Sequence, residues 1–212
     1  MRPSKNTDKQ LLLAARELLL EKGSMDIGMR EVAARAGVNM GMFYYHFKDK
    51  DDFWGNLLQE FYEEFFADLE MDASSTDSVV ENLRAAALYI GNFAVKHRVL
   101  MSALFLAGAN GDEAVRKFFK KNFIRHLRIL IDLIKRGQKE DKIIALPPIT
   151  VLVMLMGGIN APIFVYHAFS KTPFGATKMR MMGATKESIL SSEAIAERVD
   201  VMISALKKRE RK

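Results

Sequence analysis

The side chains best suited to contact a nucleic acid lie close together between residues 39 and 50. Asn39 and Tyr45 can hydrogen-bond a base edge or a phosphate, and Gly41 allows a backbone to come close to a ligand. No Lys or Arg stands between positions 39 and 47, which excludes bidentate recognition of guanine from this stretch. Met40 and Met42 can instead contact the methyl groups of thymine.

Two short helices are expected to position these residues. The first ends at Gly37, a residue that tolerates the left-handed conformation. Asn39 is a good N-cap for the second helix, which runs through Phe47. Phe43 and Phe47 lie one turn apart and are predicted to face inward together with Val38. Two helices joined by a short turn with a glycine predict a helix-turn-helix, whose second helix enters the major groove of DNA.

This stretch resembles the N-terminal domain of the TetR family of transcriptional repressors, over about residues 7–58. The pattern that carries the resemblance is Ala33-x-x-Ala36-Gly37-Val38-x-x-Gly41-x-x-Tyr44-x-His46-Phe47-x-x-Lys50. The resemblance implies that Tyr44, His46 and Lys50 hold phosphates, as does the turn before Arg30. The residues expected to bind DNA are, in full, Arg30, Asn39, Met40, Gly41, Met42, Tyr44, Tyr45, His46, Lys48 and Lys50.

The sequence departs from the family pattern at three positions. Gly28 stands where a Thr or Ser often caps the helix, Met40 replaces a common polar residue, and Met42 replaces a common Thr. These departures concern the DNA sequence that is recognised rather than DNA binding itself.

Hydrophobic periodicity predicts an all-α protein of about nine helices without a convincing strand. A capping box at Thr7-Asp-Lys-Gln10 is expected to open the first helix. Asp49 is expected to cap the helix that follows the second helix of the helix-turn-helix, which we call the reading helix. The Gly-, Met- and Lys/Arg-rich segment 171–185 is predicted to be a long irregular connection. We expect a three-helix DNA-binding domain at residues 1–52 and a ligand-binding and dimerisation domain at residues 53–212.

Charge is distributed unevenly along the 212 residues, whose formal net charge is +6. Residues 1–50 carry +3, and residues 207–212 carry +4. A basic end beside a helix-turn-helix suits the attraction of DNA phosphates, whereas the C-terminal basic run is interpreted as a solvated tail. The absence of Cys excludes disulfides and thiolate metal sites, and is compatible with a reducing cytoplasm. The N-terminus does not resemble a signal peptide, so a cytoplasmic location is expected.

An uncharged segment at residues 149–169 is long enough to span a bilayer, or to form a helix buried nearly all round. Burial is the favoured interpretation, because Asn160, His167 and Pro162 weaken a membrane span. Gly157 and Ala161 lie one turn apart and allow another helix to approach closely. The resemblance implies that the last two long helices form a four-helix dimer interface. The last of these helices is expected to contribute to the dimer interface through the stripe Val199, Met202, Ile203 and Leu206. The alternative is that both helices simply pack within one chain.

A weaker pattern concerns a small-molecule effector. Aromatic, Met and lone polar residues recur on the later helices, and the resemblance implies that this region binds a small, often hydrophobic ligand. The expected lining residues are Phe93, Met101, Phe105, Asn122, His126, Met156 and Asn160. The alternative is that these residues are plain core. No fixed charge stands among them, which favours a neutral or amphipathic effector over a highly charged one.

Catalysis is the rival class of function. The four His residues do not show metal-ligand spacing with one another, and the sequence contains no Gly-rich phosphate loop, no Gly-x-Ser-x-Gly and no Cys nucleophile. We therefore predict no enzyme, catalytic residue, metal or cofactor. The predicted function is that of a homodimeric, ligand-responsive transcriptional repressor. Its expected partners are operator DNA, a second copy and a small effector, with no membrane; a dimeric DNA-binding regulator without an effector is the alternative.

Overall fold

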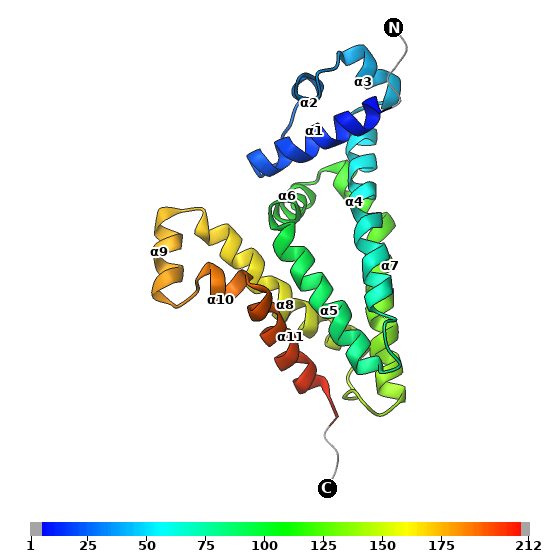
Figure 1. The fold of residues 1–212 in the computed structure, drawn as a ribbon, viewed down its shortest axis with the longest axis vertical. Coiled ribbons are helices and arrows are strands. Elements are labelled where there is room, and N and C mark those ends of the chain that lie inside the picture. The colour runs from blue at the N-terminus through cyan, green and yellow to red at the C-terminus, as the bar shows by residue number, and fades with distance from the viewer. Residues whose placement is uncertain (1–5, 209–212) are drawn as a thin grey trace. The chain divides into compact units, whose positions relative to one another are not determined.

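The computed structural model describes residues 6–208, except the side chains of Phe123 and Ile124, and its regular elements in that range are α-helices (Figure 1). A single β-bridge joins Ile143 and Lys207. The helices are α1 (Thr7–Lys22), α2 (Met29–Arg35), α3 (Met40–His46), α4 (Lys50–Asp72), α5 (Val79–Lys96), α6 (Arg98–Ala109), α7 (Glu113–Lys139), α8 (Pro148–Ser170), α9 (Pro173–Met181), α10 (Lys186–Leu190) and α11 (Ser192–Leu206). The all-α prediction is confirmed, with eleven helices in the described range rather than about nine.

The chain forms two compact units, each built from two separate chain segments. Unit 1 contains residues up to Glu63 together with Val99–Phe123, and unit 2 contains Glu64–Arg98 together with the chain from Ile124 onward. Helices α4 and α7 therefore each contribute to both units. The expected division of function at residue 52 does not follow these structural units and stays a prediction about function.

Unit 1 has a core shared by α1, α2, α3, the first part of α4, α6 and the start of α7. Its largest fully buried side chains include Phe43, Phe53 and Trp54. Helix α1 ends at Lys22 and is capped by Gly23, which has a φ of 62°. The predicted capping box is wrong, because Thr7 is itself the first helical residue and is buried, and Asn6 occupies the cap position.

Unit 2 has a core in which α5, α8 and α11 pack side by side. Gly91 on α5 makes this approach possible, since a Cβ atom there would lie 2.6 Å from Cγ2 of Ile195 and 3.0 Å from Cγ2 of Ile159. At the surface, the Arg84 guanidinium makes a two-fold contact with the Asp200 carboxylate, with Nε–Oδ1 and Nη2–Oδ2 distances of 2.5 and 3.0 Å.

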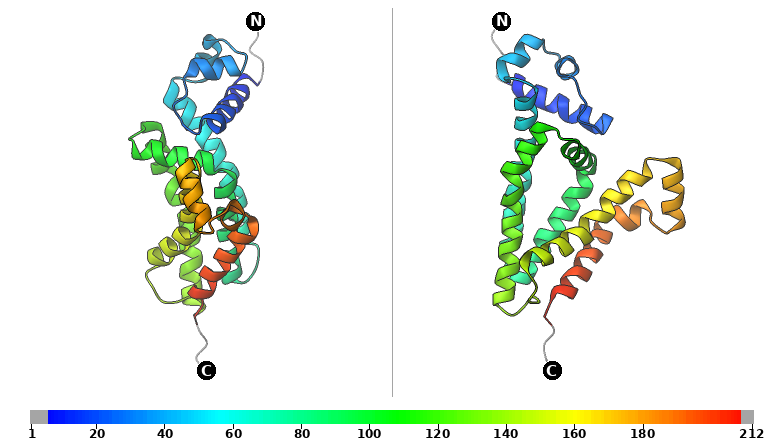
Figure 2. Two further views of the ribbon diagram at one scale, coloured as in Figure 1. Left: turned by 90° about the vertical axis from the view of Figure 1, so that its left-hand side faces the viewer. Right: turned by 180° about the vertical axis from the view of Figure 1, so that it is seen from behind.

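The segment expected to be irregular is mostly helical, so that prediction is wrong. Thr172 caps α9 by accepting a hydrogen bond from the N–H of Gly175 at 3.1 Å, and Pro173 follows at the first helical position. Thr185 and Ser188 then form a capping box at the start of α10. These local caps outweigh the Gly- and Met-rich composition. Figures 1 and 2 show α9 at the end of α8, with α10 leading back to α11.

Helix α8 is apolar but is not buried nearly all round in the single chain. Among the described residues it is the one helix with the length and hydropathy of a membrane span, and 28% of its most apolar window is buried. One face, which includes Leu155, Ile159 and Ile163, belongs to the core of unit 2. The opposite face carries Ile149, Val153, Gly157, Ala161, Val165 and Phe169 at four-residue spacing, all exposed. We call these six residues the α8 ridge.

Helix α11 does not offer the stripe expected for a dimer. Val199, Ile203 and Leu206 are buried within unit 2, and Met202 packs against the same core. Their role is therefore packing within the chain. Val201, 68% exposed, is the large apolar residue that α11 leaves at the surface.

Candidate DNA-binding interface

Local hydrogen bonds set the angle between α2 and α3. Gly37 adopts a φ of 70°, and the N–H of Val38 then donates to the carbonyl of Ala33 at 2.9 Å. The side-chain oxygen of Asn39 accepts a hydrogen bond from the N–H of Met42 at 2.9 Å, which confirms the predicted cap. Phe43 is fully buried and anchors α3 to the core of unit 1.

The exposed face of α3 follows from the burial of Phe43. Gly41, Tyr44 and Tyr45 lie at helical spacing on that face, and the two tyrosines are 61% and 69% exposed. Lys48 follows in the loop after α3 and is also exposed. Met40 is half-buried and packs against the core, because it lies one turn before Phe43. The side chains best placed to meet a groove are therefore those of the two tyrosines.

His46 lies differently from Tyr44 and Lys50, with which the family resemblance groups it. Its Nε2 atom is buried and has no hydrogen-bond partner among the described residues, and its ring meets the Tyr45 ring edge-on at a centroid distance of 5.1 Å. Contact of this nitrogen with a phosphate requires the side chain to turn outward. Tyr44 and Lys50 are both exposed.

Ion pairs sort the cations near α3 into two groups. Both guanidinium Nη atoms of Arg35 lie 2.8 Å from the carboxylate of Glu21, which raises the pKa of the guanidinium and lowers that of the carboxyl. By contrast, Arg30, Lys48 and Lys50 are exposed and make no ion pair with other described residues. These three cations are the ones available to phosphates.

The loop after α3 is held by carboxylates at the start of α4. Asp49 Oδ1 accepts the N–H of Asp52 at 2.8 Å, as predicted, and Asp52 Oδ2 accepts the N–H of Lys48 at 3.0 Å. Both bonds satisfy backbone donors around the N-terminus of α4. They hold Lys48 and Lys50 in a defined position relative to the reading helix α3.

The residues expected to line an effector site fall in both units. Met101, Phe105 and Asn122 belong to unit 1, where Phe105 is 76% exposed. The Asn122 amide is 3% exposed, and its nitrogen donates to Gln59 Oε1 and to the Phe118 carbonyl, both at 3.1 Å. A ligand would have to replace those bonds, so Asn122 is better placed to join α4 to α7.

In unit 2 the expected residues form two local groups. The ring of Phe65 lies 4.7 Å from that of Phe93 and 5.8 Å from that of His126, measured between centroids. Separately, the Asn160 amide nitrogen lies 3.8 Å from the sulfur of Met156, and the Asn160 oxygen is buried without a partner among the described residues. An unsatisfied buried oxygen of this kind can accept a hydrogen bond from a ligand or a water.

Two members of the aromatic cluster in unit 2 were not expected from the sequence. Tyr89 on α5 and His97, the C-cap residue of that helix, flank Phe93 at four-residue spacing, with the Phe93 and His97 rings 4.3 Å apart. The Tyr89 hydroxyl donates to Asp68 at 3.2 Å, and burial, together with that carboxylate, raises the pKa of the phenol. The spacing of three rings on one helical face was the signal available in the sequence.

Comparison with known proteins matches the N-terminal region to one family. Residues 11–54 match the family described as "Bacterial regulatory proteins, tetR family". The chain is 28% identical over 144 residues to the "Probable HTH-type transcriptional regulator YttP" of Bacillus subtilis, which covers 67% of this chain and 70% of that protein. It is 32% identical over 96 residues to the "HTH-type transcriptional repressor DhaR" of a Mycobacterium species, which covers 38% of this chain and 46% of that protein. The chain thus spans less than half of this second relative.

Solved structures share the fold over nearly the whole chain. A fatty acid degradation regulator, FadR, from Bacillus halodurans aligns with a TM-score of 0.71 and 16% identity, covering 98% of this chain and 100% of that one. FadR from Bacillus subtilis, solved in complex with stearoyl-CoA, aligns with a TM-score of 0.65 and 20% identity, covering 87% of this chain and 98% of that one. At these identities the likeness is one of fold.

Proposed function

The chain belongs to the TetR family of bacterial regulatory proteins, and we propose that it acts as a homodimeric, ligand-responsive transcriptional repressor. Its named relatives are helix-turn-helix transcriptional regulators, so DNA binding and regulation are the activities common to the group. The operator in this proposal is a near-palindrome, read by one α3 helix from each copy. Two such helices enter successive major grooves about 34–36 Å apart.

The observation that carries the proposal is the exposed face of α3, which presents Tyr44 and Tyr45. Three exposed cations on the neighbouring segments make no ion pair with other described residues. In this proposal Arg30, Lys48 and Lys50 bind phosphates and position the helix. Tyr45 and the free amide nitrogen of Asn39 are available to base edges. The ten residues expected from the sequence remain the proposed DNA-binding set, in which Met40, Met42 and His46 are half-buried.

The proposed dimer is formed by the α8 ridge of two copies. A ridge of six exposed uncharged residues is unusual on a soluble monomer, because water disfavours contiguous apolar surface. Gly157 lies at its centre, and a Cβ atom added there would meet no other atom within 4 Å, so a second helix can approach closely. A bilayer around α8 is the competing explanation, and sedimentation without detergent distinguishes the two.

The proposed effector is a small hydrophobic or amphipathic molecule. Support comes from the aromatic cluster around Phe93 and His126, and from the unsatisfied oxygen of Asn160. A structural neighbour was solved with stearoyl-CoA, an amphipathic ligand. The effector would release DNA by favouring a state with a different spacing of the two α3 helices. A regulator without an effector is the alternative, and in either case a cytoplasmic location gives access to the DNA.

Two measurements test the proposal. The purified protein is titrated against the intergenic DNA beside its own gene, and hydroxyl-radical footprinting is expected to show protection of an inverted repeat. A thermal-shift screen of hydrophobic compounds then identifies ligands, because a ligand of the folded state raises the melting temperature. Stabilising compounds are expected to lower operator affinity. If operator affinity is unchanged by every stabilising compound, the effector-free alternative is correct.

A further inference from the structure

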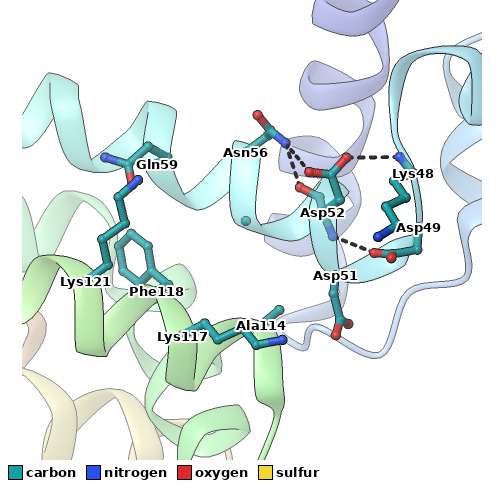
Figure 3. Close-up of a pocket in the computed structure, with 11 residues that line it drawn as sticks. Lys48, Asp49, Asp51, Asp52, Asn56, Gln59, Ala114, Lys117, Phe118 and Lys121 are labelled. Atoms are coloured by element: carbon teal, nitrogen blue, oxygen red, sulfur yellow. Dashed lines mark hydrogen bonds between the residues drawn. The ribbon is translucent and has the colours of Figure 1, made fainter.

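A hollow of about 520 Å³ lies within unit 1, between the start of α4 and the start of α7 (Figure 3). Its volume falls in the range of small-molecule sites. Its walls include Lys48, Gly55 and Gln59 on one side and Lys117, Phe118 and Lys121 on the other. We call it the α4–α7 hollow. None of the seven residues proposed for the effector lines it.

Gly55 opens this hollow from within a helix. A Cβ atom at position 55 would meet nothing within 4 Å, so no neighbouring side chain requires a glycine there. Glycine also weakens a helix interior relative to alanine. The residues around it, Trp54 and Leu58 among them, are nevertheless tightly buried. The space beside the Cα atom of Gly55 is therefore unoccupied, although the neighbouring core is well packed. A side chain added at position 55 would fill that space.

The acidic side chains that share the wall are mostly occupied by bonds within the chain. Asp49 accepts the N–H of Asp52 at 2.8 Å, and Asp52 accepts the N–H of Lys48 and the side-chain amide of Asn56 at 3.0 and 3.1 Å. Asp51 is the lining carboxylate that makes no hydrogen bond to another described residue, and Figure 3 shows it near Lys117 and Ala114, away from Lys121.

The ammonium groups are less occupied. Lys117 lies 3.8 Å from Glu113, a long ion pair, while Lys48 and Lys121 make no ion pair with other described residues. Figure 3 shows the Lys121 side chain running beside the ring of Phe118 toward Gln59. Gln59 is itself held in place by Glu63 and by Asn122. This end of the hollow thus combines a cation, a fixed amide and an apolar ring.

We propose that the α4–α7 hollow binds a small amphipathic organic anion. Its carboxylate, sulfonate or phosphate group pairs with Lys121, and its apolar body packs on Phe118 and in the space beside Gly55. A single anionic group fits the site, because Asp51 opposes negative charge at the other end. The site is separate from the effector residues proposed in unit 2 and does not depend on them.

Calorimetric titration of the full chain with naphthalene-2-sulfonate tests the proposal, with the neutral naphthalene-2-methanol as the matched compound. Lys121→Gln is expected to weaken sulfonate binding about fivefold to tenfold, the loss of one charge-assisted contact. Lys120→Gln removes the same charge from the same helix but does not line the hollow, and it is expected to leave binding unchanged. Gly55→Leu is expected to abolish binding of the sulfonate and to keep the fold.

Three results would overturn the proposal. Equal weakening by Lys120→Gln and Lys121→Gln would show a general charge effect, and full binding by a folded Gly55→Leu variant would place the ligand elsewhere. The third concerns DNA phosphates as the source of the anion. If Lys121→Gln weakens binding to a non-specific DNA duplex and leaves sulfonate affinity intact, the lysine serves DNA instead. If Gly55→Leu does not fold, the comparison of Lys121→Gln with Lys120→Gln alone tests the proposal.

Discussion

Helices α3 and α8 each leave one face exposed, and the two faces differ in chemistry. The α3 face carries two exposed phenols, and a cap and aromatic packing hold it in place within unit 1. The exposed cations of the segments around α3 make no ion pair with other described residues. The α8 ridge carries no charge and no hydrogen-bonding side chain. A polar face is stable in water before DNA arrives, whereas a contiguous apolar face is stable only when covered. The α3 face is therefore complete in one chain, and the α8 ridge is the surface that we propose a second copy covers.

The largest effect on stability is expected at Phe43, the buried side chain that holds α3 against the core of unit 1. Phe43 is fully buried, and its ring lies within 5.6 Å of the rings of Phe47 and Phe53, measured between centroids. Phe43→Ala should lower the free energy of unfolding by about 3–5 kcal/mol, because it leaves a cavity. Urea unfolding monitored by circular dichroism measures this. A loss below about 1 kcal/mol would mean that α3 is held mainly by its cap.

A smaller effect is expected at the α8 ridge, and it should concern association. Gly157→Leu places a side chain in open space, so the single chain should fold normally while two copies are forced apart at a cost of about 1–3 kcal/mol. Sedimentation velocity over a range of protein concentrations measures the dissociation constant.

The neighbouring glycine provides the matched control. A Cβ atom at Gly158 would lie 3.0 Å from the sulfur of Met202, within the core of unit 2. Gly158→Leu should therefore destabilise the fold, whereas Gly157→Leu should retain native helicity. An unchanged dimer in Gly157→Leu would place the interface elsewhere and remove the contrast between α3 and α8.

Lys50→Ala should sharpen the comparison from the DNA side. The loss of one phosphate contact is expected to flatten the slope of log affinity against log salt by about 0.9, for specific and unrelated DNA alike. Lys186→Ala, an exposed lysine on α10, should leave the slope unchanged. Fluorescence anisotropy at several salt concentrations gives both slopes. A loss confined to one operator sequence would show that Lys50 reads bases.

The parts of unit 1 that could be predicted from the sequence are governed by local interactions. The left-handed Gly37, the Asn39 cap and the burial of Phe43 each depend on residues a few positions apart, and all three predictions are confirmed. The same locality explains the error at residues 171–185. Thr172 and Thr185 are strong cap residues, but the expectation rested on composition and overlooked them.

The long-range features were harder to foresee. The net charge was counted over stretches of sequence and not over individual helices, so it did not reveal the contrast between α4 and α7. Helix α4 carries one Lys against eight Asp and Glu, whereas α7 carries nine Lys and Arg against two Asp and Glu. The α11 stripe showed the correct period, but periodicity does not say whether a face meets its own chain or a second one. Burial of Val199 and Ile203 inside unit 2 resolves that choice.

The smallest effect concerns the buried side of α8, where a titratable group contrasts with the uncharged ridge. His167 is 8% exposed, and burial, together with the cations Lys171 and Arg98, lowers the pKa of its imidazole from an ordinary value of 6.5. The unfolded chain therefore binds a proton at this site at a higher pH than the folded chain does. The contribution to stability is complete above pH 6.5 and is lost as the pH falls toward the lower folded pKa.

His167→Gln should remove this part of the acid sensitivity, because glutamine does not titrate. Urea unfolding of both proteins at constant ionic strength, from pH 7.5 down to about pH 5, should show a steeper loss of stability in the wild type. Carboxylates titrate in both proteins, so the difference between the two curves isolates the imidazole. Parallel curves would mean that His167 takes up its proton equally well in the folded chain. The buried face of α8 would then be open to water, and the contrast between a dry inner face and an apolar ridge awaiting a partner would no longer hold.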